Sequence, residues 1–251
     1  MKNLVSDESR YQLFYWPTIQ GRGEFIRLAL EQAGASYIDV ARRAESSGLG
    51  LPALLRCLDA EAQSHPPFAP PFLKIGNQLI AQSANILLFL GPRLKLVPKA
   101  EETRLWAHQL QLTIADLVNE IHDSHHPIAG SLYYRNQKAE ARRRAADLIT
   151  TRLPKFFSYF ERVLTVNPQG SKYLVDDALS YVDLSLFQII AGLRYAYPNA
   201  LRSLEPLCQR CITLYEMVQR EPRIKTYLKS RRRLPFNQGG IFRHYPELDL
   251  A

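Results

Sequence analysis

Long apolar segments are missing from this sequence. The longest uninterrupted apolar run covers residues 86–90, whereas a helix that spans a bilayer needs about 20 apolar residues. The first eight residues carry two acids and no apolar stretch, unlike a secretory signal. We therefore expect a cytoplasmic protein with no membrane partner.

Cysteine is also scarce, with three residues in 251. So few cysteines, in an odd number, exclude a disulfide framework and favour a reducing compartment. Cys208 and Cys211 have the spacing of a zinc-binding pair, but no second pair completes a tetrahedral site. The cluster of His122, His125 and His126 likewise comes with no matching acidic motif. We predict two core cysteines and no metal.

The composition lacks the bias of a disordered or fibrous chain, since 46% of the residues are hydrophobic and 22% are charged. The 32 Lys and Arg against 24 Asp and Glu give 32 − 24 = +8. Such an excess fits a nucleic-acid partner, a solvated basic surface or attraction for small anions. The basic runs 142–144 and 231–233 have no recognition motif beside them. We interpret both runs as exposed helix faces and expect no nucleic-acid partner.

The first 92 residues show the pattern of a small mixed sheet. The expected elements are a strand at 11–16, a helix at 21–33, a parallel strand at 37–41, a short helix at 51–58 within an irregular stretch at 44–70, a hairpin at 72–75 and 78–81, and a helix at 83–90. Gly76-Asn77 is a two-residue hairpin turn. Ser83 is the expected N-cap of the last helix, and Gly91-Pro92 is its expected end.

Beyond Pro98 the strand-like alternation disappears and helical spacing takes over. Leu105, Leu112, Leu117 and Ile121 predict one long helix. Further helices are expected at 141–164 with a restart at Pro154, at 184–193 and at 207–217, followed by an irregular tail at 231–251. We therefore expect an α/β domain at 1–92 and an all-α domain with an extended tail at 101–251.

Tyr15 lies at the end of the first expected strand, at the sheet edge where functional sites collect in α/β folds. A tyrosine hydroxyl there can donate to a thiolate. A hydrogen bond of about 1.5–3 kcal/mol lowers a thiol pKa from about 8.5 by about one to two units. The alternative interpretation is a tyrosine that packs in the core.

Three more features favour an anionic ligand. Arg22 stands near the positive end of the first helix, and Gln82-Ser83 offers backbone N–H groups and a hydroxyl to a carboxylate at the start of the next helix. A cis bond in Pro70-Pro71 would let the residue before it pair with a bound peptide strand. The alternatives are a solvated arginine and a plain helix cap. Together with Tyr15, these features indicate an anionic peptide that carries a thiol.

In this order and spacing, Tyr15-Trp16-Pro17, the Gly-Arg-Gly-Glu run at 21–24, Pro71 and Gln82-Ser83 resemble the cytosolic glutathione transferase superfamily. The similarity is closest to its tyrosine-type classes, alpha, mu, pi and sigma, and we expect a bacterial source. Residues 113–117 resemble the segment whose aspartate reaches across the dimer. Ser180 and Asp183 resemble the family's N-capping box. The resemblance covers nearly the whole chain.

The resemblance implies a thioredoxin-like α/β N-terminal domain, an all-helical C-terminal domain and a homodimer that uses reduced glutathione as co-substrate. It also implies a role for each site residue. Tyr15 stabilises the thiolate with support from Arg22, and Pro70 and Pro71 contact the cysteinyl part of glutathione. Gln82 and Ser83 hold the γ-glutamyl carboxylate, Asp116 of the second subunit binds the amine, and Arg56, or failing it Arg43, binds the glycyl carboxylate.

Three features depart from the family pattern. Pro70 stands where the family has a residue with a free amide, and it has no N–H to donate. We therefore expect half of the usual backbone hydrogen-bond pair to the cysteinyl part. Asp176-Asp177 stands where Gly-Asn is usual before the capping box, and the stretch 44–70 is longer than usual.

The expected activity is attack by the glutathione thiolate on a small hydrophobic electrophile, as in detoxification. The acceptor is expected between the domains, near Tyr15, residues 128–134, and Phe236 or Phe242. Two alternatives stay open. One is a glutathione- or ligand-binding protein of the same fold without turnover, and the other is a glutathione-dependent isomerase or peroxidase.

Overall fold

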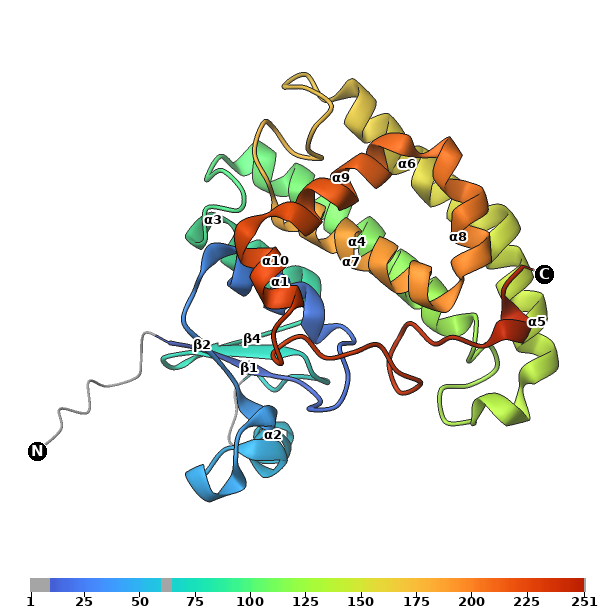
Figure 1. The fold of residues 1–251 in the computed structure, drawn as a ribbon. Helices are drawn as coiled ribbons and strands as arrows, with labels where there is room; N and C mark the ends of the chain where they lie inside the picture. The colour runs from blue at the N-terminus through green and yellow to red at the C-terminus, as the bar shows by residue number, and fades with distance from the viewer. Residues whose placement is uncertain (1–9, 60–64, 251) are drawn as a thin grey trace, which may run out of the picture.

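The computed structural model describes residues 10–59 and 65–250. A small sheet near the N-terminus packs against a larger group of helices, and the C-terminal tail runs back along both (Figure 1). None of the helices in these two ranges is long and apolar enough to cross a membrane. Two segments used in the sequence analysis lie outside the described ranges. They are the first eight residues, which were compared with a secretory signal, and residues 60–64 of the expected irregular stretch.

The sheet has the strand order β2-β1-β3-β4. The strands are β1 (Tyr11–Phe14), β2 (Tyr37–Asp39), β3 (Phe72–Ile75) and β4 (Gln78–Ala81). β1 and β2 are parallel, and the other two pairs are antiparallel. The predicted parallel pair and the predicted hairpin are both confirmed.

Each face of the sheet has its own apolar core, because successive strand residues point to opposite faces. Leu13 and Leu73 pack with Ile26 of α1 (Gly23–Ala33) and with residues of α3 (Ser83–Arg93). On the other face, Phe14 stacks on Phe72 with ring centroids 4.7 Å apart. This second cluster includes residues of α2 (Gly50–Leu58). The sheet is thereby covered on both sides, and α1 and α3 join it to the helical part, where they contact α7 and α4.

The rest of the described chain is helical. Its α-helices are α4 (Glu101–Asp123), α5 (Lys138–Asp147), α6 (Leu153–Val166), α7 (Tyr181–Ala196), α8 (Pro198–Leu204), α9 (Gln209–Arg220) and α10 (Pro222–Leu228). α5 passes through a wider π turn, Leu148–Arg152, into α6, and Pro154 near the start of α6 has no N–H for a regular helical bond. The predicted restart at Pro154 is thus confirmed. The division of the chain into domains at 1–92 and 101–251 stays a prediction.

Helix α7 is the buried centre of the helical part and contacts α1, α4 and α9. It begins at a capping box, as predicted. The Ser180 hydroxyl accepts from the Val182 and Asp183 N–H groups, and the Asp183 carboxylate accepts from the Ser180 N–H at 2.7 Å. Burial raises the pKa of Asp183 to about 6, against the lowering effect of these hydrogen bonds.

Several predicted boundaries are wrong. β1 ends at Phe14, before Trp16, and β2 ends at Asp39, where the chain turns into a short 3-10 helix. α1 begins at Gly23, because Gly21 has a φ of +46° that does not fit a helix. α3 runs through Pro92, and a proline in the last turn of a helix costs that helix one hydrogen bond at its end.

The prediction that Ser83 is an N-cap is also wrong. Gln82, with a φ of 68°, is the N-cap of α3, and Ser83 is the first helical residue. The Ser83 hydroxyl donates to the carbonyl oxygen of Arg22 at 3.3 Å. This side chain therefore bridges the starts of α3 and α1 and does not cap its own helix.

The predicted apolar face of α4 is only half right. Leu117 and Ile121 are buried, whereas Leu105 is 59% exposed and Leu112 is 48% exposed. The buried stripe is spaced at three to four residues, and Leu105 and Leu112 fall outside it. Leu207 is also exposed, before the start of α9, and helices α8 and α10 were not predicted.

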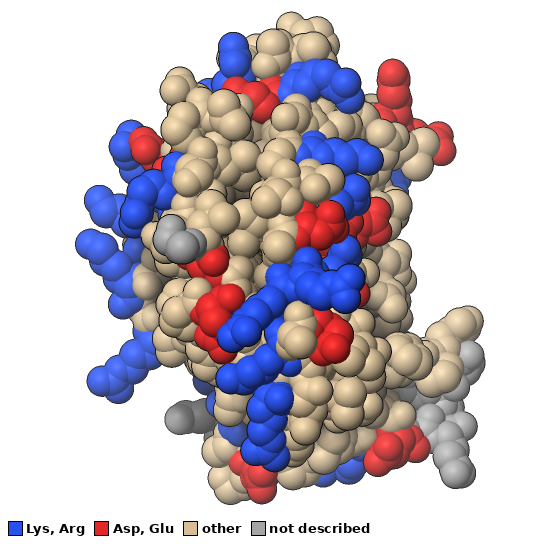
Figure 2. All heavy atoms as spheres, turned by 90° about the vertical axis from the view of Figure 1, so that its right-hand side faces the viewer, with Lys and Arg blue, Asp and Glu red and all other residues tan. Residues whose placement is uncertain are grey.

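Basic and acidic side chains are mixed on the face of the molecule seen in Figure 2. Arg142 and Arg143 of α5 are exposed, as predicted, and Arg144 pairs with Asp147 at 3.1 Å. The second basic run, 231–233, is not a helix face. α10 ends at Leu228, and the Arg233 side chain is largely buried against Glu24.

Candidate functional site

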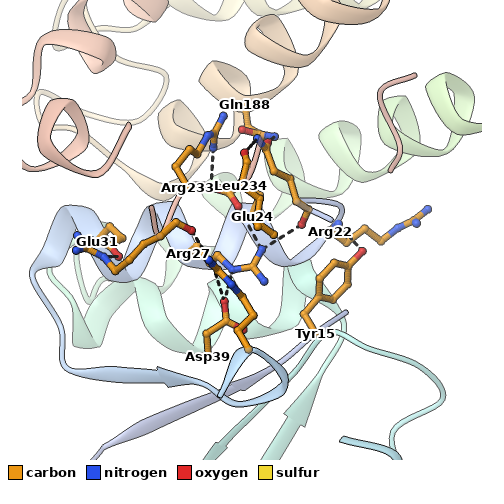
Figure 3. A network of polar contacts seen from close by, with 12 residues as sticks. Tyr15, Arg22, Glu24, Arg27, Glu31, Asp39, Gln188, Arg233 and Leu234 are labelled. Atoms are coloured by element: carbon orange, nitrogen blue, oxygen red, sulfur yellow. Dashed lines mark hydrogen bonds and ion pairs between the residues drawn. The ribbon is translucent and has the colours of Figure 1, made fainter. Parts of the chain in front are cut away.

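Tyr15 follows the last residue of β1 and lies under the turn that leads into α1 (Figure 3). The residue is 4% exposed, and its ring fills the space beside Gly21 and Gly23. A Cβ on Gly21 would lie 2.1 Å from the hydroxyl oxygen. The two glycines therefore let the turn close over the tyrosine ring.

The Tyr15 hydroxyl oxygen accepts a hydrogen bond from the backbone N–H of Arg22 at 2.8 Å. Burial raises the pKa of Tyr15, against the lowering effects of that bond and of the Arg22 and Arg27 guanidinium groups. The phenol therefore stays protonated at neutral pH. Since its oxygen already accepts from Arg22, its own proton is the part that a ligand can use.

Arg22 joins three elements. Its N–H bonds Tyr15, its carbonyl accepts from Ser83, and its guanidinium donates to Asn119 of α4 at 2.6 Å. The structure thus brings together Tyr15, Arg22 and Ser83, which were selected from the sequence. Asn119 was missed, because nothing in its sequence neighbourhood distinguishes it from other polar residues of a helix.

Gln82 and Ser83 line a cavity of about 350 Å³ together with Arg22 and Asn119. It lies where α1, α3 and α4 meet, and Phe25 is part of its apolar wall. The Pro70-Pro71 peptide bond is cis, immediately before β3. The cis bond that the sequence left open is therefore present, and Pro70 supplies no N–H there.

Asp116 shares a groove with Asn119 of this group, whereas Arg56 lies on α2. Asp116 is exposed on α4 and lines a larger groove of about 890 Å³ with Phe156 and Tyr159 of α6. Arg56 is exposed on α2, and its guanidinium donates to the Gly48 carbonyl at 3.1 Å. Among the described residues, no hydrogen bond links either side chain to Tyr15, Arg22 or Ser83. Their roles stay predictions.

A buried network of charges, which sequence reasoning missed, lies beside Tyr15 (Figure 3). Glu24 is fully buried and pairs with Arg27 at 3.2 Å and with Arg233 at 2.6 Å. Arg27 also binds Asp39 at 2.7 Å. Although burial alone raises the pKa of Glu24, the two guanidinium groups and the Tyr227 hydroxyl lower it. Glu24 is thus an ionised carboxylate inside the protein.

The expected acceptor region stays a prediction. Phe242 is buried against Gly192, and Phe236 stacks on Tyr195 with ring centroids 5.2 Å apart. Ile128 and Tyr133 are exposed. These side chains are distributed between the core and the surface.

The predicted core cysteines are confirmed, since Cys208 and Cys211 are buried. Burial also raises the pKa of the Cys208 thiol to about 12. Within residues 10–59 and 65–250, no group of three or more His, Cys, Asp or Glu is placed to hold a metal ion. The histidine cluster instead holds the tail. Nε2 of His125 bonds the Ile241 carbonyl at 2.8 Å, and its Nδ1 lies 2.5 Å from that of His126.

We expect the free energy of unfolding to fall as the pH drops from 7 to 5. Burial, together with nearby Arg243 and His122, lowers the pKa of His125 to about 3 and that of His126 to about 4, although Asp123 raises the latter slightly. Both rings stay neutral in the folded state, whereas in the unfolded chain they take up protons below about pH 6.5. Their contribution is therefore complete above that pH and is lost as the pH falls toward the folded pKa values.

Urea unfolding at several pH values measures this effect. The double variant His125→Gln, His126→Gln serves as the control, because it removes both titrations. A pH dependence equally steep in the variant and the wild-type protein would contradict the prediction.

The chain has sequence similarity to glutathione S-transferases. The family model "Glutathione S-transferase, C-terminal domain" matches residues 122–231. The glutathione S-transferase of Plasmodium falciparum (isolate 3D7) is 24% identical over 225 residues, which cover 88% of this chain and 96% of that protein. Glutathione S-transferase P of Bos taurus is 26% identical over 232 residues, which cover 92% of this chain and 98% of that protein.

Solved structures have the same fold. The Pi-class glutathione S-transferase of Onchocerca volvulus aligns with a TM-score of 0.69 at 22% identity, over 92% of this chain and 98% of that one. Prostaglandin synthase D of Nilaparvata lugens aligns with a TM-score of 0.67 at 19% identity, over 90% of this chain and 100% of that one. The predicted fold class, a thioredoxin-like α/β part followed by an all-α part, is confirmed. This chain is thus similar in sequence to glutathione S-transferases over most of its length, and it shares their fold.

Proposed function

We propose that this protein is a tyrosine-type glutathione transferase that activates the thiol of glutathione for attack on small hydrophobic electrophiles. The observation that carries the proposal is the Tyr15 hydroxyl, which is protonated and already accepts from the Arg22 N–H at 2.8 Å. Its proton can be donated to a thiolate, and such a hydrogen bond favours the ionised form of the thiol. The proposed cytoplasmic location and bacterial source rest on the sequence alone.

The proposed glutathione site runs from Tyr15 to the start of α3. Ser83 and Gln82 would hold the γ-glutamyl carboxylate, since the first N–H groups of α3 have no partner within the helix. Pro71 would present its backbone to the cysteinyl part, and Pro70, without an N–H, would leave a single hydrogen bond there. Arg56 is the proposed partner of the glycyl carboxylate.

The proposed reaction needs no covalent enzyme intermediate. The thiol gives its proton to solvent when it ionises, and the thiolate then attacks the electrophilic carbon. In a substitution the leaving group departs to solvent, and in an addition the anion that forms takes up a proton from solvent. Tyr15 and the nearby Arg22 guanidinium stabilise the negative charge on sulfur before the attack. Holding the two reactants side by side supplies the remaining rate enhancement.

Titration of the bound thiol tests the proposal. Thiolate absorbance is followed against pH for glutathione on the wild-type protein, with S-methylglutathione as the control that has no thiol. We expect a thiol pKa about one to two units below the free value of about 8.5. No binding, or binding with an unshifted pKa, would overturn the activation step.

The two alternatives are distinguished when the titration is combined with a turnover assay on a panel of substrates. A binding protein without turnover would hold glutathione but conjugate no member of a panel of aryl halides, enones and epoxides. A glutathione-dependent isomerase or peroxidase would show the lowered thiol pKa and act on peroxides or isomerisable ketones instead. One protein of the same fold is a prostaglandin synthase, so prostaglandin synthesis is the first activity to add to the panel.

We also propose a homodimer, in which Asp116 of the second subunit meets the glutathione amine. Exposed apolar side chains support it: Phe68 is 94% exposed just before the cis Pro70-Pro71 bond, and Leu105 and Leu112 are exposed on α4 beside Trp106. A contiguous exposed apolar surface marks an interaction site, and we propose that these side chains contribute to one in the dimer.

Phe68→Ala should weaken the dimer about 30-fold, the effect of removing a buried aromatic anchor from an interface. Sedimentation equilibrium measures the dissociation constant. Leu207→Ala is the matched control, because Leu207 is also highly exposed but lies before α9. A wild-type monomer, or equal dissociation constants for wild type and Phe68→Ala, would contradict this interface.

A further inference from the structure

Residues 231–237, which we call the strap, cross from α10 to the turn that covers Tyr15. Figure 3 shows Arg233 and Leu234 above Glu24 and beside Gln188, on the side of α1 that faces the helices. Three of its contacts are with the segment between β1 and the first turn of α1. Arg233 pairs with Glu24 at 2.6 Å, the Leu234 carbonyl accepts from the Gln20 side chain, and the Asn237 side chain donates to the Thr18 carbonyl at 2.8 Å.

The strap is fixed at its first residues as well. The Arg42 guanidinium donates to the carbonyls of Arg231 and Arg232, at 3.1 and 2.6 Å. The Arg232 guanidinium binds Glu31 of α1 at 2.8 Å. The strap is therefore fixed to Arg42 and to α1 as well as to the turn over Tyr15, and it does not hang free from α10.

Glu24 makes the central contact charge-dependent. Its Oε1 accepts from Arg233 and from the Tyr227 hydroxyl, which lies 2.5 Å away, and its Oε2 accepts from Arg27. An ionised carboxylate that is fully buried needs charged partners on both oxygens. Arg233 supplies one of them from a segment more than 200 positions away along the chain.

The same turn fixes the environment of the Tyr15 hydroxyl. Arg27 donates to the Gln20 carbonyl at 3.3 Å, and its guanidinium carbon lies 5.8 Å from the centre of the Tyr15 ring. The Gln20 side chain also accepts from Gln188 of α7 at 2.8 Å. The Arg22 N–H that bonds the Tyr15 oxygen follows directly in this turn, so any movement of residues 18–22 changes that hydrogen bond.

We propose that the strap positions the turn over Tyr15, and that Arg233 is a positioning residue for thiol activation, acting through Glu24, Arg27 and the Gln20 backbone. The inference rests on the proposed function of Tyr15. Without Arg233, the Glu24 carboxylate would keep only Arg27 and Tyr227 as partners. It would then draw the Arg27 guanidinium away from the Gln20 carbonyl. The turn would loosen, the Arg22 N–H would move from the Tyr15 oxygen, and the hydroxyl would become a weaker donor to sulfur.

The first test compares Arg233→Gln, Arg233→Lys and the wild-type protein by thiol titration, steady-state kinetics and thermal unfolding. Arg220→Gln is the matched control, because Arg220 also pairs with a glutamate, at 3.2 Å, but on the surface of α9. We expect Arg233→Gln to raise the bound thiol pKa by about one unit and lower kcat near pH 6.5 about tenfold. Arg233→Lys, which keeps the charge, should stay near wild type.

A lowered melting temperature with an unchanged thiol pKa in Arg233→Gln would overturn the proposal, because Arg233 would then be structural alone. If Arg233→Gln does not fold, Asn237→Ala decides the question. Its contact with the Thr18 carbonyl is at the surface, and its loss should raise the thiol pKa in the same direction, whereas an unchanged pKa would again overturn the proposal. An unshifted pKa in the wild-type protein would instead refute the proposed function.

Discussion

Tyr15→Phe is expected to lower kcat/KM at neutral pH by about 10-fold to about 150-fold, because the lost hydrogen bond to a charged sulfur is worth about 1.5–3 kcal/mol. The thiol pKa of bound glutathione should return toward its free value. The loss should shrink as the pH rises above the free thiol pKa, since the thiolate then forms without assistance. A pH profile of kcat/KM for both proteins measures the effect.

The control for this variant is Tyr11→Phe, at the start of the same strand. Tyr15→Phe also leaves the Arg22 N–H without its acceptor, so a stability loss of about 1–3 kcal/mol is expected and is checked by urea unfolding. Equal activity in Tyr15→Phe and wild type, in a folded protein, would refute the role of the hydroxyl. An equal loss in Tyr11→Phe would point to a general effect on the sheet.

The local parts of the fold could be predicted from the sequence. Gly76-Asn77 closes a hairpin because a two-residue turn depends only on those two residues. The capping box likewise depends only on Ser180 and on Asp183, three residues later. Tyr15, Arg22 and Ser83 come together because each stands at the end of a strand or the start of a helix, and such ends gather at one edge of the sheet.

The rest depends on contacts between distant segments. Arg233 looks like one member of an exposed basic run, and Glu24 like a first-turn acid, yet they form a buried pair across 209 positions. Leu105 and Leu112 match a helical spacing, but the packing of α4 buries a neighbouring stripe and leaves them outside. A sequence pattern shows that a side chain is charged or apolar, but it does not show which distant residues that side chain contacts.

Asp183→Ala is expected to lower the free energy of unfolding by about 2–6 kcal/mol, the largest effect on stability that we predict. The Asp183 carboxylate accepts from the N–H groups of Leu174 and Ser180, at 2.8 and 2.7 Å, and from the Ser180 hydroxyl. Both backbone groups are buried, and each unsatisfied buried donor costs about 1–3 kcal/mol. The helix that loses its box is α7, which contacts α1 and therefore the elements around Tyr15.

Urea unfolding at pH 7 measures the change, with Asp177→Ala as the control, since Asp177 is exposed in the turn before the same helix. Asp183→Asn should fall between the two, because the amide keeps one acceptor oxygen. A loss below about 1 kcal/mol in Asp183→Ala would mean that water reaches both N–H groups. In that case the start of α7 would be held by the apolar packing of Leu174 and Tyr181, and the capping box would contribute little to the link between α7 and α1.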